Sequence, residues 1–349
     1  MFQQDRALVE VSVGRAAVVE GEGVAAAHAG DEAAFAGLAE RYRWELRVHC
    51  YRMLGSFDEA EDLVQETLLR AWRYRGSFHG SSTFRAWLYR IATNVCLDFL
   101  DRRSRQPAPG EAGGPAEVGW LQPFPDRLLE PVADRDAEPE TVVVARETIE
   151  LAFLVAIQHL PPRQRAVLIL RDVLGWSAAE TGELLEMSVA AVKSALQRAR
   201  PVLRAHLPQR PAGQAPAPVA PTGQERELLR RFMAAHERAD IAAFAELLSE
   251  DVRLSMPPLP YSFAGRAEVA AFAEHTLGPG SPLHEGQWRG VPVWANRQPA
   301  MAGYLRQPGE RSYRAQVLNV LRVEDGRIAE ITAFQPEVFD AFGLPATLP

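Results

Sequence analysis

The stretch that decides the fold runs from Ser56 to Arg105 and reads SFDEAEDLVQETLLRAWRYRGSFHGSSTFRAWLYRIATNVCLDFLDRRSR. Its charge is uneven, because acids crowd its beginning whereas eight arginines and only two acids occupy Arg70–Arg105. Apolar residues recur every three or four positions in both halves, which predicts two helices. The Gly76–Ser82 segment separates them with turn residues and carries Phe78. We therefore expect an acidic helix, an aromatic loop and a helix that ends in arginine.

The same periodicity predicts which side chains of the two helices are buried. In the first helix the apolar face comprises Val64, Leu68, Ala71 and Trp72. In the second helix the stripe comprises Phe84, Leu88, Ile91, Val95 and Phe99, and it leaves Arg85, Tyr89, Thr93 and Asn94 on other faces. The residues off each stripe are the ones that we expect to meet a partner.

These fifty positions resemble the conserved second region of sigma-70-type RNA polymerase sigma factors, in the extracytoplasmic-function group. The motifs DLVQE and FRAWLYRIATNVCLDFLDRR carry the resemblance. In that family the DLVQE helix docks on the polymerase clamp, and the following loop and helix open and hold the −10 promoter element. The resemblance implies polymerase contacts at Asp62, Gln65 and Glu66. It implies −10 DNA contacts at Phe78, Arg90, Asn94, Asp98, Arg102 and Arg103.

Length and composition limit the possible classes of protein. A chain of 349 residues is long enough for two or three domains. The net charge of −7 argues against a protein that coats nucleic acid without sequence preference, although local basic patches remain possible. No apolar run suits a membrane span and no signal pattern opens the chain, so we expect a soluble cytoplasmic protein. Cys50 and Cys96 are interpreted as small buried hydrophobes, and no metal or cofactor is expected.

The chain is predicted to be multidomain, with two all-α sigma domains and one α+β domain. We expect a flexible leader over 1–27, sigma region 2 over 28–105, a linker over 106–140, sigma region 4 over 141–207, a second linker over 208–223 and a C-terminal domain over 224–345. Asp31 is the expected N-cap of the first helix, which should bury Phe35, Leu38, Tyr42 and Leu46. The first linker carries Trp120, Leu121 and Phe124, which either pack lightly on a neighbour or, as the resemblance implies, thread the polymerase's RNA-exit path.

A helix-turn-helix is predicted within 141–207. Ser177 and Glu180 form a capping box at the start of one helix, and Ser188 caps a second helix over Val189–Arg200. Gly182 is small enough for the two helices to cross closely. Taken alone, the pattern also fits a solvated charged face on an ordinary helix pair. It resembles sigma region 4, which reads the −35 element and touches the polymerase flap, and this implies DNA contacts at Ser188, Val189, Lys193, Ser194, Gln197 and Arg198.

Two residues depart from the pattern of that region. Glu186 stands in the turn where related sequences usually have glycine, so a positive φ there would cost on the order of 1 kcal/mol. Pro201 is expected to kink or stop the recognition helix near Arg200.

The C-terminal stretch reads as helices followed by strands, with a hairpin turn at Asp325-Gly326. It resembles the SnoaL-like, nuclear-transport-factor-2-like cone, an α+β fold that often encloses an apolar pocket. Candidate pocket residues are Tyr261, Trp288, Trp294 and Tyr304. Asp251 and His275 are polar candidates, but each is interpreted as structural, and no catalytic residue is assigned. The expected role of this domain is regulatory.

We therefore predict a sigma factor whose activity the C-terminal domain modulates. Core RNA polymerase and promoter DNA are the expected partners, and an anti-sigma factor or a small ligand at the C-terminal domain remains open. One alternative is a one-component helix-turn-helix regulator that senses a ligand, which would bind DNA without polymerase. Another is a SnoaL-like cyclase or isomerase, which would show turnover by residues 224–349 alone.

Overall fold

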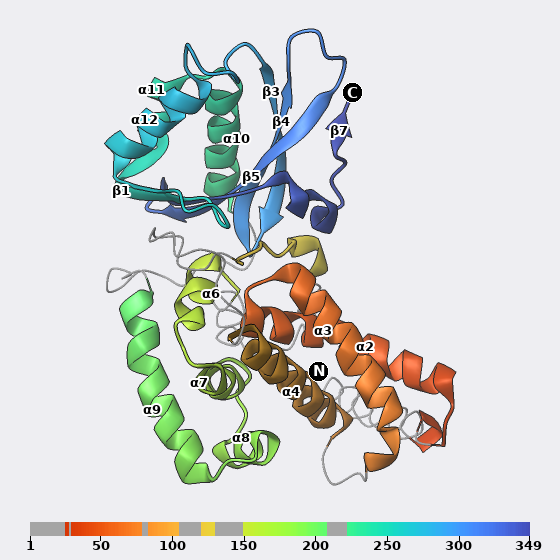
Figure 1. Ribbon diagram of the computed structural model, residues 1–349. Helices are drawn as coiled ribbons and strands as arrows, with labels where there is room; N and C mark the ends of the chain where they lie inside the picture. Colours follow the sequence, from red (N-terminus) through yellow and green to blue (C-terminus); the bar gives the residue numbers. More distant parts are fainter. Residues whose placement is uncertain (1–24, 28, 79–82, 105–119, 130–148, 208–221) are drawn as a thin grey trace, which may run out of the picture.

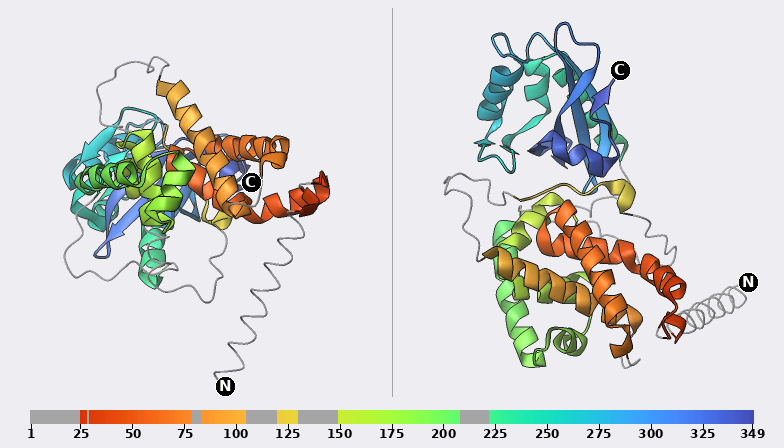
Figure 2. Two further views of the ribbon diagram at one scale, coloured as in Figure 1. Left: turned by 90° about the horizontal axis from the view of Figure 1, so that it is seen from below. Right: turned by 45° about the vertical axis from the view of Figure 1, so that its right-hand side comes forward.

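The computed structural model describes residues 25–27, 29–78, 83–104, 120–129, 149–207 and 222–349 (Figure 1). Two groups of helices lie side by side, and a body of helices and strands stands on top of them. Residues 120–129 run between that body and the helices, as both Figure 1 and the right-hand view of Figure 2 show. This segment belongs to the first predicted linker, whose remaining residues lie outside the described ranges.

The first helical group consists of α2 (Glu32–Leu54), α3 (Phe57–Arg73) and α4 (Phe84–Ser104), with a 3-10 turn η1 (Arg75–Ser77) after α3. The predicted cap is confirmed, because the Asp31 side chain accepts a hydrogen bond from the amide of Ala34 at 3.0 Å. The predicted buried positions of α2 are confirmed too: Phe35, Leu38, Tyr42 and Leu46. Cys50 and Cys96 are both buried free thiols, as expected.

The predicted outer face of α4 is partly wrong. Tyr89 and Thr93 were placed off the apolar stripe, yet they are only 2% and 0% exposed. The reason is that α4 is packed on two sides. His49 of α2 lies 2.9 Å from the Thr93 hydroxyl, and Trp176 of the second helical group packs on Tyr89 with ring centroids 5.5 Å apart. The spacing of apolar residues indicates one buried face of a helix, so it could not show that α4 is also buried against Trp176 of the second helical group.

The second helical group contains α6 (Leu151–Gln158), α7 (Pro162–Leu168), the π-helical turn η3 (Ile169–Val173), α8 (Ala178–Leu185) and α9 (Val189–His206). The capping box is confirmed: the Glu180 amide donates to Ser177 Oγ at 3.1 Å, and the Ser177 amide donates to Glu180 Oε2 at 2.7 Å. Helices α8 and α9 therefore form the predicted helix-turn-helix.

The turn between α8 and α9 is tight. Glu186 adopts the predicted left-handed conformation, with φ 55°. Gly182 allows the close approach, because a Cβ there would lie 2.6 Å from the Met187 carbonyl oxygen. Of the kink or stop predicted at Pro201, the stop is wrong, since α9 continues through it to His206. Pro201 and Gln197 are both exposed, so the Gln197 carbonyl that loses its helical donor is open to water.

The upper body contains α10 (Gly223–Glu237), α11 (Ile241–Leu247), α12 (Arg266–Leu277), the 3-10 helix η4 (Pro336–Phe342) and a seven-stranded sheet. The sheet order is β2-β1-β6-β5-β4-β3, with β7 paired to β5. The strands are β1 (Leu248–Ser255), β2 (Ser262–Ala264), β3 (Gln287–Ala295), β4 (Gln298–Arg306), β5 (Tyr313–Glu324), β6 (Arg327–Phe334) and β7 (Thr347–Leu348). Only the β1–β6 pair is parallel among these strands.

The turns and packing of this sheet explain how it joins the rest of the chain. The predicted β5–β6 hairpin is confirmed, with φ 48° at Asp325 and 74° at Gly326. One face of the sheet packs on α10, α11 and α12 around Phe232, and the other face contributes Tyr304 to a core that continues into both helical groups. The upper body is therefore packed against the helices rather than merely tethered to them.

Candidate nucleic-acid and polymerase interface

Helix α3 presents one exposed stripe along its length. Asp62 and Gln65 are exposed on it, and Glu66 beside it is half-exposed and accepts from Arg70 Nε at 2.7 Å. Leu69 continues the stripe and is 62% exposed, the largest exposed fraction among the bulky apolar side chains of the described residues. Leu69 is not among the residues predicted for the polymerase contact, although its position off the predicted apolar face was the signal for it.

Helix α4 and the residues before it form one wall of a cleft of about 1160 Å³. Arg90 and Asn94 are exposed on this wall, and Phe78 packs near Phe84 and Trp87 with ring centroids 5.8 and 5.5 Å apart. Residues 79–82 of the predicted aromatic loop, including His79, lie outside the described ranges. The opposite wall comes from the second helical group and comprises Leu174, Gly175, Trp176, Glu180, Glu183 and Leu184.

Two contacts join α4 to the second helical group at this cleft. Arg90 Nη2 forms an ion pair with Glu186 Oε1 at 2.7 Å, although both side chains are largely exposed. Tyr89 packs on Trp176. The DNA-facing side of α4 that the resemblance implies is therefore opposed by the helix-turn-helix of the same chain.

The remaining predicted −10 residues lie toward the end of α4 and are engaged elsewhere. Asp98 pairs with Arg70 at 3.2 Å, and the Arg102 Nε donates to the Asp98 carbonyl at 3.3 Å. Arg103 donates to both carboxylate oxygens of Glu59, at 3.0 and 2.9 Å. The structure thus does not gather the six residues on one open surface. Burial raises the pKa of the Glu59 carboxyl, and the Arg103 guanidinium opposes that shift.

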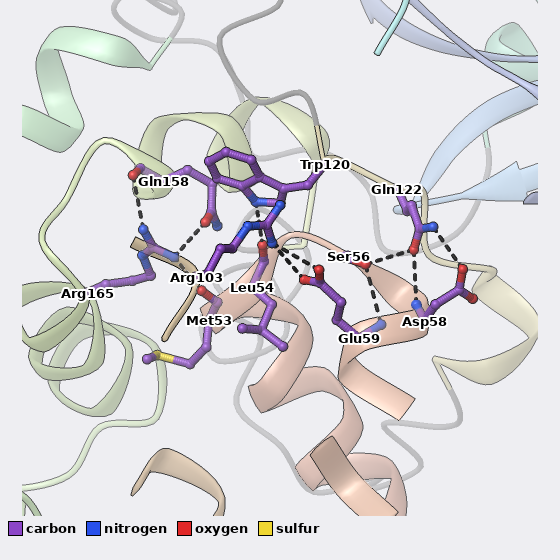
Figure 3. Close-up of polar contacts among 10 residues, drawn as sticks. All are labelled: Met53, Leu54, Ser56, Asp58, Glu59, Arg103, Trp120, Gln122, Gln158 and Arg165. Atoms are coloured by element: carbon purple, nitrogen blue, oxygen red, sulfur yellow. Dashed lines mark hydrogen bonds and ion pairs between the residues drawn. The ribbon is translucent and has the colours of Figure 1, made fainter. Parts of the chain in front are cut away.

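Residues 120–129 are bound tightly at the corner between α2 and α3 (Figure 3). The Trp120 indole donates to the Leu54 carbonyl at 2.8 Å and lies under the Arg103 guanidinium, 4.1 Å from the ring centroid. The Gln122 amide oxygen accepts from the Ser56 hydroxyl at 2.9 Å and from the Asp58 amide at 3.0 Å. Light packing of this linker, one of the two expectations, is therefore wrong.

The helical groups also meet at the same corner. Arg165 of α7 is 4% exposed and donates to the Met53 carbonyl at the end of α2 and to Gln158. Burial lowers the pKa of its guanidinium to about 10, so Arg165 stays charged at neutral pH. A buried cation surrounded by carbonyl oxygens fixes α7 against α2.

Asn296 is the residue that joins the upper body to this corner. It is 0% exposed and stands in the β3–β4 turn, where Asn296 and Arg297 have φ 56° and 60°. Its side-chain amide donates to Tyr51 Oη at 2.8 Å and to the Ile149 carbonyl at 2.7 Å. Its side-chain oxygen accepts from the Phe124 amide at 2.7 Å, and its own amide donates to the Phe124 carbonyl at 2.9 Å. One side chain therefore touches the first helical group, the linker segment and the start of the second group.

Asn296 is not among the residues predicted from the sequence. The available signal was an asparagine between two predicted strands, because asparagine tolerates the left-handed conformation that a tight hairpin requires. Neighbouring contacts strengthen the junction: the Arg297 amide donates to Asp126 in the 3-10 turn η2 (Asp126–Leu128) at 2.8 Å, and the Leu151 amide donates to Gln298 Oε1 at 3.2 Å.

The recognition helix α9 is open to solvent along one face. Val192 and Leu196 are buried as predicted, and Ser188 caps the helix by accepting from the Ala191 amide at 3.1 Å. Val189 is 44% exposed, and Lys193, Gln197 and Arg198 are also exposed. Ser194 is half-buried and accepts from Arg198 at 2.6 Å. Helix α9 lies on the outer side of the second group (Figure 1).

The candidate pocket residues of the upper body do not meet at one site. Trp288 lies against His236 of α10, with ring centroids 4.6 Å apart, whereas Tyr304 packs on Phe339 of η4 on the other face of the sheet. The Tyr304 hydroxyl donates to the Pro345 carbonyl at 3.0 Å, and Tyr261 is 53% exposed. Trp294 is half-buried, and the weighed polar candidates Asp251 and His275 are exposed.

Family models match three parts of the chain: sigma-70 region 2 over residues 38–106, sigma-70 region 4 over 150–201 and a SnoaL-like domain over 229–331. The chain is 43% identical over 326 residues to the ECF RNA polymerase sigma factor SigG of Mycobacterium tuberculosis, covering 90% of this chain and 85% of that protein. It is 35% identical over 182 residues to SigW of Bacillus subtilis, covering 51% of this chain and 91% of that protein.

A solved structure has the same overall fold. The Mycobacterium tuberculosis extracytoplasmic-function sigma factor SigJ matches with a TM-score of 0.55 at 24% identity, covering 88% of this chain and 98% of that one. Within the residues that the structure describes, none of the helices has the length and apolar character to cross a membrane. The family models cover both sigma regions and the cone, and SigG matches nearly the whole chain. The chain therefore belongs to the extracytoplasmic-function sigma factors, which direct RNA polymerase to promoters, and it carries a SnoaL-like C-terminal domain.

Proposed function

We propose that the exposed stripe of α3 is the surface that binds core RNA polymerase. Asp62 and Gln65 present polar groups on it, and Glu66 borders it. Leu69 lies in the same stripe and is 62% exposed, which suits an apolar anchor surrounded by polar contacts. This stripe carries the proposal, because a helix that faced only water would gain nothing from an exposed leucine beside acidic residues.

The promoter contacts divide between the two helical groups. Arg90, Asn94 and Phe78 combine a cation, an amide and an aromatic ring, which suits the separated strand of the −10 element. The recognition helix α9 presents its predicted −35 residues to solvent, and such a helix enters the major groove N-terminus first. Its contacts are Ser188, Val189, Lys193, Ser194, Gln197 and Arg198.

The conformation of the chain is a closed one that must open on the promoter. The −10 and −35 elements are about 25 base pairs apart, which is about 85 Å of duplex at about 3.4 Å per pair. Arg90 and Glu186 join the two DNA-reading modules at 2.7 Å, so both elements cannot be read at once in this conformation. Threading residues 120–129 through the RNA-exit path also requires Trp120 and Gln122 to leave the α2–α3 corner.

The SnoaL-like domain favours the closed conformation in this account. Its Asn296 turn holds the linker segment at Phe124, the first helical group at Tyr51 and the second at Ile149. Polymerase binding would have to break these contacts, so the domain restrains activity until a signal, a ligand or the polymerase itself releases it. The site of action is the cytoplasm, where the polymerase transcribes.

Run-off transcription with bacterial core polymerase tests this function. The full chain should yield transcripts from its own promoter, and the double variant Asp62→Ala, Glu66→Ala should lose polymerase binding while it folds normally. A chain that ends after His206 should be more active than the full chain, because it lacks the Asn296 turn. Unchanged polymerase binding by the double variant would contradict the assignment of the α3 stripe.

The two alternatives predict different results in the same assay. A one-component regulator would bind promoter DNA without polymerase and would leave the α3 stripe without a partner. A cyclase or isomerase would need its polar groups to converge on a substrate, whereas Trp288 and Tyr304 contact different layers on opposite faces of the sheet.

A further inference from the structure

The cleft between α4 and the helix-turn-helix places opposite charges face to face. One wall is basic and aromatic, and its lining residues include Arg70 at the end of α3 and Arg85 and Arg90 on α4. The facing wall carries Glu180 and Glu183 on α8, and Glu186 follows in the turn. The recognition helix α9 shares none of this wall and keeps its DNA-facing residues open to solvent. The two DNA-reading faces are therefore covered unequally.

Glu186 is an unusual residue for its position. Its φ of 55° lies in the left-handed region that favours glycine, so the backbone alone gives no reason for a glutamate there. Its side chain reaches across to Arg90 Nη2 at 2.7 Å. A carboxylate on an arginine makes the same charge-assisted hydrogen bonds as a phosphate does. The strained turn thus delivers an anion to a residue that the −10 element would otherwise engage.

We propose that α8 and its following turn are an internal cover of the −10-reading face. Trp176 anchors the cover on Tyr89, and the Glu186 carboxylate occupies Arg90 where a DNA phosphate would lie. The free chain then reads the −35 element alone, and it reads the −10 element only after region 4 moves away. This inference rests on the proposed function, since it assigns the order in which the two elements are read.

Two DNA probes applied to the full-length chain test the cover. One is a duplex that carries the −35 element of the chain's own promoter, and the other is the single non-template strand of its −10 element. Glu186→Gln keeps the side-chain size and removes the anion. Because exposed ion pairs are weak, it should raise affinity for the −10 strand about two- to five-fold and leave affinity for the −35 duplex unchanged. Trp176→Ala should act in the same direction on the −10 strand.

Glu183→Gln is the matched control. It makes the same change in net charge one turn earlier, and Glu183 forms no ion pair with α4 among the described residues. An equal gain from Glu183→Gln would overturn the proposal, because the effect would then be general electrostatics. A rise in affinity for the −35 duplex that parallels the rise for the −10 strand would also overturn the proposal. The same holds if none of the variants binds the −10 strand. Polymerase-dependent transcription by the unaltered chain, measured in parallel, separates these failures from a failure of the proposed function.

Discussion

Helices α4 and α9 both carry cationic and polar side chains suited to DNA, yet their surroundings differ. On α9, Lys193 and Arg198 are exposed, and neither pairs with an acid of another element among the described residues. On α4, Arg90 is paired with Glu186, and Arg103 is held between Glu59 and Trp120. The difference between the two helices arises from these tertiary contacts. The proposed cover therefore restrains the −10 module rather than the −35 module.

The largest effect is expected from replacing Asn296, because this residue helps to hold the linker segment that contacts Arg103 of α4. Asn296→Ala removes the acceptor of the Phe124 amide and the side-chain donor of the buried Ile149 carbonyl, which costs about 1–3 kcal/mol for each group. We expect the free energy of unfolding to fall by about 3 kcal/mol in urea titrations and run-off transcription to rise.

Asp325→Ala is the control for that variant, because it places alanine at a positive φ in the other hairpin, away from the junction. Asp325→Ala should strain its turn as Asn296→Ala does, but it should leave run-off transcription unchanged. Equal behaviour of the two variants would mean that the junction does not restrain the chain.

Lowering the pH should decrease the stability of the first helical group more than that of α9. Burial, assisted by Arg52 and Arg85, lowers the pKa of His49 to about 3 from 6.5. Between pH 6.5 and about pH 3 the unfolded state binds a proton at His49 that the folded state does not bind. The free energy of unfolding is therefore unaffected by His49 above pH 6.5 and decreases as the pH falls below it. We expect about 2 kcal/mol less stability at pH 5.

Denaturant titrations at pH 7 and pH 5 measure that loss, and His49→Gln isolates it from carboxylate titration. The variant should lose less stability between the two pH values than the unaltered chain. An identical loss in both chains would exclude His49 as the source.

Changes on α9 should have the smallest effect on the closed conformation. Lys193→Ala should weaken −35 duplex binding several-fold and reduce the salt dependence by about one phosphate contact, with no change in unfolding. Arg200→Ala is a useful comparison, since Arg200 is paired with Asp172 at 2.8 Å and is less available to DNA. Fluorescence anisotropy at several salt concentrations provides the measurement. A change in −10 strand binding by Lys193→Ala would show that the two faces are not independent.

The features that could be predicted from the sequence are those fixed by local chemistry. The Ser177–Glu180 capping box, the left-handed Glu186 and the Asp325-Gly326 hairpin each depend on residues a few positions apart. The longer helices and strands were predictable for the same reason, whereas the short strands β2 and β7 were not predicted. Pro201 was the local exception, because an exposed helix face tolerates the lost hydrogen bond.

The features that could not be predicted depend on contacts between distant segments. Tyr89 is buried because Trp176 arrives from another helical group, and Asn296 is buried because three segments converge on it. Neither contact leaves a periodic signal in the sequence. The resemblance implies −10 contacts for all six predicted residues, whereas Arg90 pairs with Glu186 and Arg103 lies against Trp120 of the linker segment.

The distance between the two helical groups tests the central claim most directly. Fluorescent labels at Glu32→Cys on α2 and Arg204→Cys on α9 would react selectively, because Cys50 and Cys96 are buried. Energy transfer in the free chain sets the reference, and it should fall when core polymerase and promoter DNA are added. Asn296→Ala should lower it in the free chain as well. Unchanged energy transfer in an actively transcribing complex would contradict a closed chain that opens on polymerase.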